Sequence, residues 1–154
     1  MANVRPKTVV DMKLSGVSES HARSRINGRD VVVLIDEPKE RGGTNQGLTP
    51  TETLIASLIG CTNVVGSRIA EKMGLHVEDL KIEADAQFDR RGVMLEEEIA
   101  VPFPAVKLTI SCRCNATPEQ LDQWKRDLAR FCPVSKVIRG SGSTVSEVWN
   151  VSPL

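Results

Sequence analysis

The alternation of apolar and polar residues predicts short strands in the first third of the chain. Residues 8–14 (TVVDMKL) alternate with a period of two, which is typical of a half-buried strand. Residues 20–26 and 30–36 flank Asn27-Gly28, a dipeptide typical of two-residue hairpin turns, so we expect an antiparallel hairpin here. The apolar run within residues 30–36 is continuous, which favours a strand covered on both faces.

A long apolar helix is predicted between Pro50 and Met73. Thr49 is suited to cap its start, Pro50 fits the first helical position, and Gly74 favours its end. Apolar residues cover most of its circumference as far as Arg68, a pattern typical of a buried helix. At roughly 1.5 Å per residue the helix spans on the order of 35 Å, which is long for a chain of this size. We therefore expect a second subunit to cover part of it.

The second half of the chain is predicted to mix strands and helices. In chain order we expect a strand, an acidic connection, a strand, an amphipathic helix, a short helix and a strand, over residues 75–89, 90–102, 103–114, 117–131, 133–139 and 144–150. This order indicates an α+β fold with antiparallel sheets rather than regular βαβ units. We expect a single domain over residues 1–154.

Composition and charge exclude several classes of function. Lys plus Arg and Asp plus Glu both number 20, so the formal net charge is zero. That balance argues against a nucleic-acid binder, because affinity for phosphate depends on basic charge. Aromatic residues make up 3% of the chain and Tyr is absent, so a base-stacking surface is not expected. No segment is predicted to span a membrane, and residues 1–16 lack the apolar core of a signal peptide, so we expect a cytoplasmic protein.

Four cysteines carry the candidate chemistry, and in a cytoplasmic chain they are expected to be free, catalytic or metal-bound. Cys61 lies on the apolar stripe of the long helix, which is typical of a buried thiol. Cys132 precedes Pro133 at a predicted helix N-terminus, where backbone N–H groups favour the thiolate and a lower pKa. Cys112 and Cys114 share one face of a strand. They are either packed core thiols or two ligands of a metal site, although no second pair with zinc-type spacing accompanies them.

Two cysteine motifs resemble those of the OsmC/Ohr family. Residues 47–61 (GLTPTETLIASLIGC) resemble its central-helix motif, in which Pro and an acid begin a helix of small and apolar residues that leads to a cysteine. Residues 131–140 (FCPVSKVIRG) resemble its second motif, Cys-Pro-x-Ser followed by Arg-Gly, and residues 36–43 resemble the loop before the helix. The resemblance extends from about residue 20 to residue 150. It implies an intertwined homodimer in which antiparallel sheets of both chains pack around long central helices.

The resemblance also implies thiol-dependent reduction of organic hydroperoxides. Cys61 would be the peroxidatic thiol, which attacks the distal peroxide oxygen and becomes a sulfenic acid, and Cys132 would resolve it as a disulfide. An external dithiol, lipoyl-type in the family, would restore both thiols, and neither a cofactor nor a metal is implied. The apolar stripe around Cys61 favours an alkyl or fatty-acid hydroperoxide over hydrogen peroxide.

An arginine and a glutamate complete the site that the resemblance implies. In the family an Arg from an N-terminal strand stabilises the thiolate and is held by a Glu at the start of the central helix. Arg25 is the first candidate, Arg23 the second, and Arg29 follows the hairpin turn. Glu52 is the candidate acid, but Thr51 occupies the family's acidic position, and one position rotates a helical side chain by about 100°. This departure motivates an alternative, a non-catalytic dimer of the same fold that binds an apolar or thiol-reactive small molecule.

Overall fold

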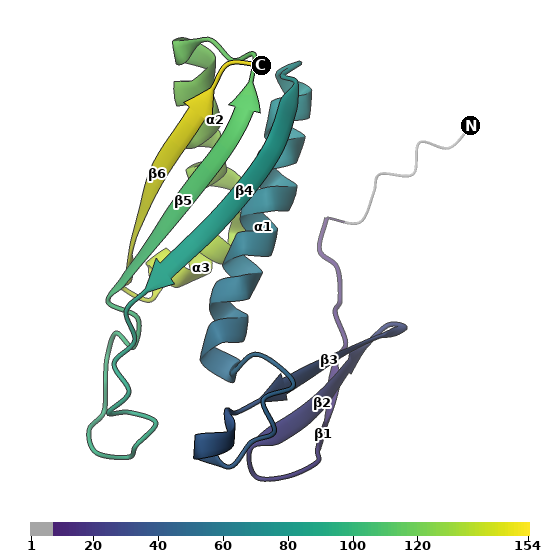
Figure 1. Ribbon diagram of the computed structural model, residues 1–154, viewed down its shortest axis with the longest axis vertical. Coiled ribbons are helices and arrows are strands. Elements are labelled where there is room, and N and C mark those ends of the chain that lie inside the picture. The colour runs from purple at the N-terminus through teal and green to yellow at the C-terminus, as the bar shows by residue number, and fades with distance from the viewer. Residues whose placement is uncertain (1–7) are drawn as a thin grey trace. The chain divides into compact units, whose positions relative to one another are not determined.

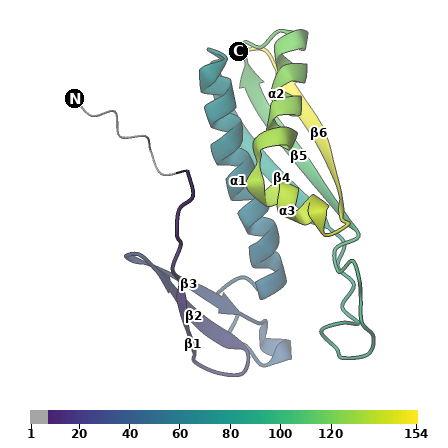
Figure 2. The same ribbon diagram turned by 180° about the vertical axis from the view of Figure 1, so that it is seen from behind.

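The chain forms two compact units, one before and one after the boundary between Thr53 and Leu54, and each has its own three-stranded sheet (Figures 1 and 2). This computed structural model describes residues 8–154. The expectation for residues 1–16 therefore lies partly outside the described residues.

The N-terminal unit is an antiparallel sheet with the order β1-β2-β3, followed by a short 3-10 helix. Its elements are β1 (Ser15–Ser18), β2 (Arg23–Gly28), β3 (Val31–Asp36) and η1 (Lys39–Arg41). Residues 8–14 lie outside the sheet, so the strand predicted there was wrong: alternation alone does not supply a neighbouring strand. The apolar residues at the start of β3 are about half exposed rather than covered on both faces.

The predicted hairpin exists, but its loop lies two residues later than expected. Gly28 pairs with Val31, so the two loop residues are Arg29 and Asp30. Arg29 adopts the positive φ, 56°, that the tight turn requires. The register places Arg23 opposite Asp36, which indicates that interactions at the far end of the strands outweigh the local preference of Asn27-Gly28.

Asp36 anchors the loop that leads from β3 to the long helix. Its buried carboxylate accepts hydrogen bonds from the Thr44 hydroxyl at 2.5 Å and from the backbone N–H groups of Thr44 and Gln46. These bonds, that of the Thr44 hydroxyl above all, lower the pKa of Asp36 to about 2. Arg23 donates to Thr44 Oγ1 and Gln46 Oε1, both at 3.0 Å, so the loop is held from two sides.

Helix α1 (Pro50–Lys72) confirms the predicted long helix, and its ends follow local chemistry. Thr49 and Glu52 form a reciprocal cap: the Glu52 N–H donates to Thr49 Oγ1 at 3.2 Å, and the Thr49 N–H donates to Glu52 Oε2 at 2.8 Å. At the other end Gly74 has φ 69° and donates to the Glu71 carbonyl, while Leu75 donates to the carbonyl of Ala70.

The C-terminal unit places its helices on one face of a mixed sheet (Figures 1 and 2). Its further elements are β4 (Val77–Ala86), β5 (Ala105–Cys114), α2 (Pro118–Phe131), α3 (Pro133–Gly140) and β6 (Thr144–Ser152). Helix α2 begins with a capping box formed by Thr117 and Gln120. β4 is antiparallel to β5, but β6 is parallel to β5, so the prediction of purely antiparallel sheets was wrong for β6. The reason is that α2 and α3 return the chain to the starting end of β5 before β6 begins.

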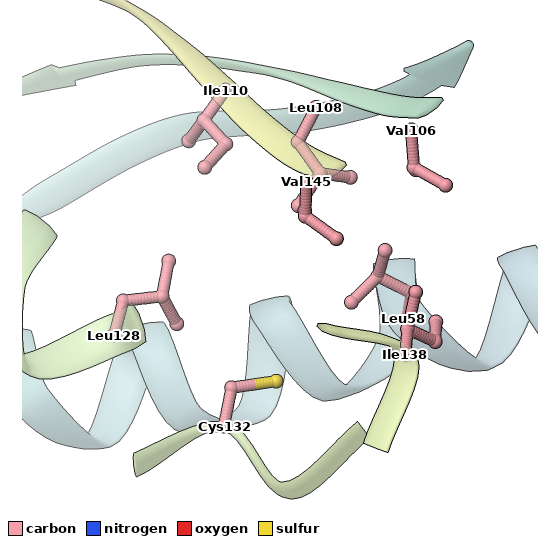
Figure 3. Close-up of a cluster of buried hydrophobic side chains, with 8 residues drawn as sticks. All are labelled: Leu58, Val106, Leu108, Ile110, Leu128, Cys132, Ile138 and Val145. Carbon is pink, nitrogen blue, oxygen red and sulfur yellow. The ribbon is translucent and has the colours of Figure 1, made fainter. Parts of the chain in front are cut away.

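The main core lies between this sheet and the helices (Figure 3). Alternate residues of β5 point into it, as the period of two predicts. Its buried members are Leu58, Val106, Leu108, Ile110, Leu128, Cys132, Ile138 and Val145.

Helix α1 buries only a narrow stripe of every fourth residue, and Val64 is 48% exposed. Within residues 8–154 it is the one helix that is long and apolar enough to cross a membrane, judged by length and composition. The expectation that no segment could span a membrane is corrected to this extent. This is weak evidence for a span, because core helices pass the same test and Leu58 of α1 is fully buried in the core.

Candidate functional site

The structure brings Cys61 and Cys132 together, although they lie far apart in the sequence. Cys61 is in the middle of α1, and Cys132 stands between α2 and α3. Both thiols are free. Cys132 is 1% exposed and belongs to the buried core, whereas Cys61 is partly buried and packs against that core. Figure 3 shows the Cys132 sulfur inside the cluster, between Leu128 and Leu58.

Cys132 caps α3, as the sequence predicts, but its thiol is not the low-pKa group that the helix N-terminus suggested. Pro133 takes the first helical position, and the Lys136 N–H donates to the Cys132 carbonyl at 3.1 Å. Burial raises the pKa of Cys132, and the adjacent Cys61 thiol adds to this. The N–H groups of Ser135 and Val134 oppose the rise. The effect of desolvation on the Cys132 pKa therefore outweighs that of the helix N-terminus, and the expectation of a lowered pKa was wrong.

A polar cluster next to Cys132 was not assigned any role from the sequence. Ser135 Oγ accepts from Arg139 Nε at 3.1 Å, and Arg139 also pairs with Glu147 of β6 at 3.5 Å. Ser135 is buried, and the side chain of Glu147 is 14% exposed. The spacing of four between Ser135 and Arg139 on a predicted helix is the signal that could have revealed the first of these contacts.

The candidate arginine and glutamate of the N-terminal unit do not pair with each other. Arg25 Nε and Arg23 Nε each bind Glu19, both at 2.6 Å, and the hydrogen bond from Arg25 is the main cause of a lowered Glu19 pKa. Glu52 instead caps α1, and its pKa is lowered chiefly by the backbone N–H of Thr49. Glu19 was not among the residues singled out from the sequence.

Cys112 and Cys114 lie side by side in a second buried cluster. They are 5% and 3% exposed, and the cluster also holds Ala70 and Trp124. Burial raises the pKa of Cys112 to about 11, with a further contribution from Cys114. Over residues 8–154 no group of three or more His, Cys, Asp or Glu side chains could hold a metal ion. Their burial among apolar side chains fits the interpretation as packed core thiols.

The connection between β4 and β5 forms a closed loop with an apolar tip. The rings of Phe88 and Phe103 meet at its base, with their centroids 5.1 Å apart. Arg91 pairs with Asp89 at 2.7 Å and also with Glu97. The exposed residues at the tip are Val93, Met94 and Leu95.

Comparison with known proteins identifies the family of this fold. A family model described as OsmC-like protein matches residues 43–147, more than half of the chain. No curated protein matches the chain.

Three solved structures illustrate the likeness, each covering nearly all of both chains. The OsmC-like protein from Mycoplasma pneumoniae is 12% identical, with a TM-score of 0.74 over 94% of this chain and 98% of that one. The organic hydroperoxide resistance protein OsmC from Legionella pneumophila is 15% identical, with a TM-score of 0.61 over 95% and 99%. The organic hydroperoxide resistance protein OhrB of Bacillus subtilis is 17% identical, with a TM-score of 0.56 over 93% and 98%. At these identities the likeness shows the fold alone.

Proposed function

Given that the chain belongs to the OsmC-like protein family, we propose that it is a thiol-dependent peroxidase that reduces organic hydroperoxides to alcohols. The observation that carries this proposal is the meeting of a partly exposed thiol, Cys61, with a buried one, Cys132. Two of the similar structures are organic hydroperoxide resistance proteins, which agrees with this activity.

The difference in exposure gives each thiol its part in the reaction. The Cys61 thiolate attacks the distal oxygen of the hydroperoxide, the O–O bond breaks, and the alkoxide takes up a proton and leaves as the alcohol. Sulfur is oxidised by two electrons, so Cys61 becomes a sulfenic acid. The Cys132 thiolate then attacks the Cys61 sulfur, the S–O bond breaks, and hydroxide leaves as water. Burial protects Cys132 from the peroxide itself.

The surroundings of the thiols favour an apolar substrate. Ile55, Val65 and Phe103 pack against the same core as Cys61. An alkyl or fatty-acid hydroperoxide places its hydrocarbon part among such side chains more favourably than hydrogen peroxide, which has none. An external dithiol of the lipoyl type reduces the disulfide and closes the cycle.

The proposal extends to the assembly and to the two charged residues. α1 and β3 expose apolar side chains that a second copy of this chain would cover, so we propose a homodimer as the active form. The proposal also includes a single domain per chain and a cytoplasmic location. Arg25 is the proposed thiolate-stabilising cation and Glu52 its proposed acidic partner, although in this chain Arg25 binds Glu19 and Glu52 caps α1. Light scattering on the purified protein tests the dimer, and a monomer at micromolar concentration contradicts it.

Peroxide consumption tests the activity. Reduced protein is mixed with cumene hydroperoxide or with hydrogen peroxide, in the presence of a dithiol. We expect fast consumption of the organic peroxide, its loss in Cys61→Ser and its weakening in Cys132→Ser. Full activity in Cys61→Ser contradicts the proposal.

A second candidate function rests on the contacts of Glu52 and Arg25. Because Glu52 caps α1 and Arg25 binds Glu19, the arginine–glutamate pair implied by the family is not formed between them. This observation favours a non-catalytic dimer that binds an apolar or thiol-reactive small molecule. An intact dimer that binds an apolar fluorescent probe but consumes no peroxide supports this candidate over the peroxidase.

A further inference from the structure

A continuous set of contacts leads from the first turn of α3 to the sheet. Ser135 is 4% exposed, and its Oγ accepts the Arg139 Nε–H at 3.1 Å. The same guanidinium reaches Glu147 of β6 through its terminal nitrogen at 3.5 Å. One planar group thus links the helix turn that follows Cys132 to a strand of the sheet. Guanidinium suits this task, because its donors are held in fixed directions.

The contacts continue from the sheet to the helix that carries Cys61. Glu147 Oε2 accepts the Trp149 Nε1–H at 3.1 Å. The Trp149 ring meets the Trp124 ring edge-on, with centroids 5.1 Å apart. Trp124 Nε1 donates to the Gly66 carbonyl of α1 at 2.9 Å, and this bond is buried. These side-chain contacts therefore connect the helix that carries Cys61 with the helix turn that follows Cys132.

We propose that Arg139 is a positioning residue for Cys132, which holds the first turn of α3 through Ser135 and acts on disulfide formation rather than on peroxide attack. The assignment to that step rests on the proposed function. α3 has only eight residues, and so short a helix depends on contacts of its side chains with the rest of the fold.

The chemistry explains why the position of this turn matters. Negative charge on the Cys132 sulfur must form before it attacks the Cys61 sulfenic acid, and burial disfavours that charge. The N–H groups of Val134 and Ser135 are the groups that oppose the effect of burial. If Arg139 is lost, the turn moves and those N–H groups face the sulfur less well. A loss equivalent to one pKa unit reduces the thiolate about tenfold at neutral pH.

The experiment separates the two chemical steps in the full-length dithiol protein. Cys61 sulfenic acid is trapped with dimedone after a peroxide pulse, and the Cys61–Cys132 disulfide is quantified by mass spectrometry over time. Diamide, a diazene that oxidises dithiols without peroxide, drives the same disulfide in a parallel arm. The variants are Arg139→Gln, Arg139→Lys and Ser135→Ala. Arg130→Gln is the matched control, because Arg130 is exposed, lies close to Cys132 in sequence and contacts the Phe131 ring.

We expect Arg139→Gln and Ser135→Ala to slow disulfide formation about tenfold in both arms, and Arg139→Lys to restore part of the rate. Sulfenic acid formation and the Arg130→Gln control are expected to match the wild type. Unchanged disulfide rates in Arg139→Gln and Ser135→Ala overturn the proposal, as does an equal slowing of both steps. If Arg139→Gln does not fold, Ser135→Ala decides the question. A wild type that forms no sulfenic acid with any peroxide refutes the peroxidase, while the diamide arm still tests Arg139.

Discussion

The C-terminal unit contains two pairs of neighbouring thiols that differ in almost everything except their proximity. Cys112 and Cys114 are two positions apart on one strand, and both are at most 5% exposed. Cys61 and Cys132 come from different helical elements, and only Cys132 is fully buried. Burial raises the pKa of Cys132, but the N–H groups of Ser135 and Val134 act to lower it. For Cys112, burial and the adjacent Cys114 thiol both raise the pKa. The proposed redox pair therefore differs from the strand pair in two ways besides proximity: one of its thiols is partly exposed, and the other has N–H groups beside it that favour its thiolate.

The largest expected effect is the replacement of the reachable thiol. Cys61→Ser removes the nucleophile, so peroxide consumption should fall by about a thousandfold or more. Stopped-flow measurement with cumene hydroperoxide checks this. Comparable loss in Cys112→Ser contradicts the distinction between the pairs.

Replacement of the buried partner should have a smaller and different effect. Cys132→Ser leaves the first step intact but blocks the disulfide, so steady-state turnover should fall about tenfold or more while sulfenic acid accumulates on Cys61. Mass spectrometry of the dimedone adduct detects this species. A normal disulfide involving Cys61 in this variant means that another thiol resolves it.

The buried strand pair is expected to influence stability at high pH. The unfolded chain ionises Cys112 near pH 9.0, but the folded chain holds the proton up to about pH 11. Because the unfolded state then binds fewer protons, the stabilising effect is complete below pH 9.0 and is lost as the pH rises through about 11. The free energy of unfolding should fall by on the order of 2 kcal/mol more in the wild type than in Cys112→Ala. Urea unfolding between about pH 8 and about pH 10.5 measures most of that difference. The same dependence of the unfolding free energy on pH in the wild type and in Cys112→Ala contradicts the prediction.

The smallest effect is expected for Cys114. Cys114→Ala removes one buried sulfur, so the protein should lose about 1 kcal/mol of stability. Peroxide consumption should stay within about twofold of the wild type, because Cys114 belongs to the other buried cluster. A fall in activity without a fall in stability gives the strand pair a part in the reaction.

The helix ends could be predicted because their chemistry is local. Thr49 with Glu52, and Thr117 with Gln120, are short-range pairs that the sequence displays directly. The hairpin loop could not be placed, because its register depends on contacts at the other end of the strands, around Asp36. The parallel pairing of β6 likewise depends on where α2 and α3 return the chain.

The candidate site was predictable to a similar degree. The two cysteine motifs indicated Cys61 and Cys132, which the structure places next to each other. The raised pKa of Cys132 could not be read from its helix terminus, because desolvation is a property of the whole core. The role of Glu19 could not be predicted from the sequence, because this residue lies outside any strand and its ion pair with Arg25 depends on the turn between β1 and β2.

The edge-on pair of Trp124 and Trp149 also gives the protein an optical signal of its own. They are its only two tryptophans and it has no tyrosine, so its near-ultraviolet emission arises from this one pair. Trp124 donates a hydrogen bond to Gly66 of α1, the helix that carries Cys61. Trp149 donates one to Glu147, which also pairs with Arg139. A change in how α1 sits against the segment that carries Cys132 is expected to alter the environment of both indoles at once. We therefore expect the proposed oxidation of Cys61 and Cys132 to change the tryptophan emission, which can be recorded in real time without an attached dye.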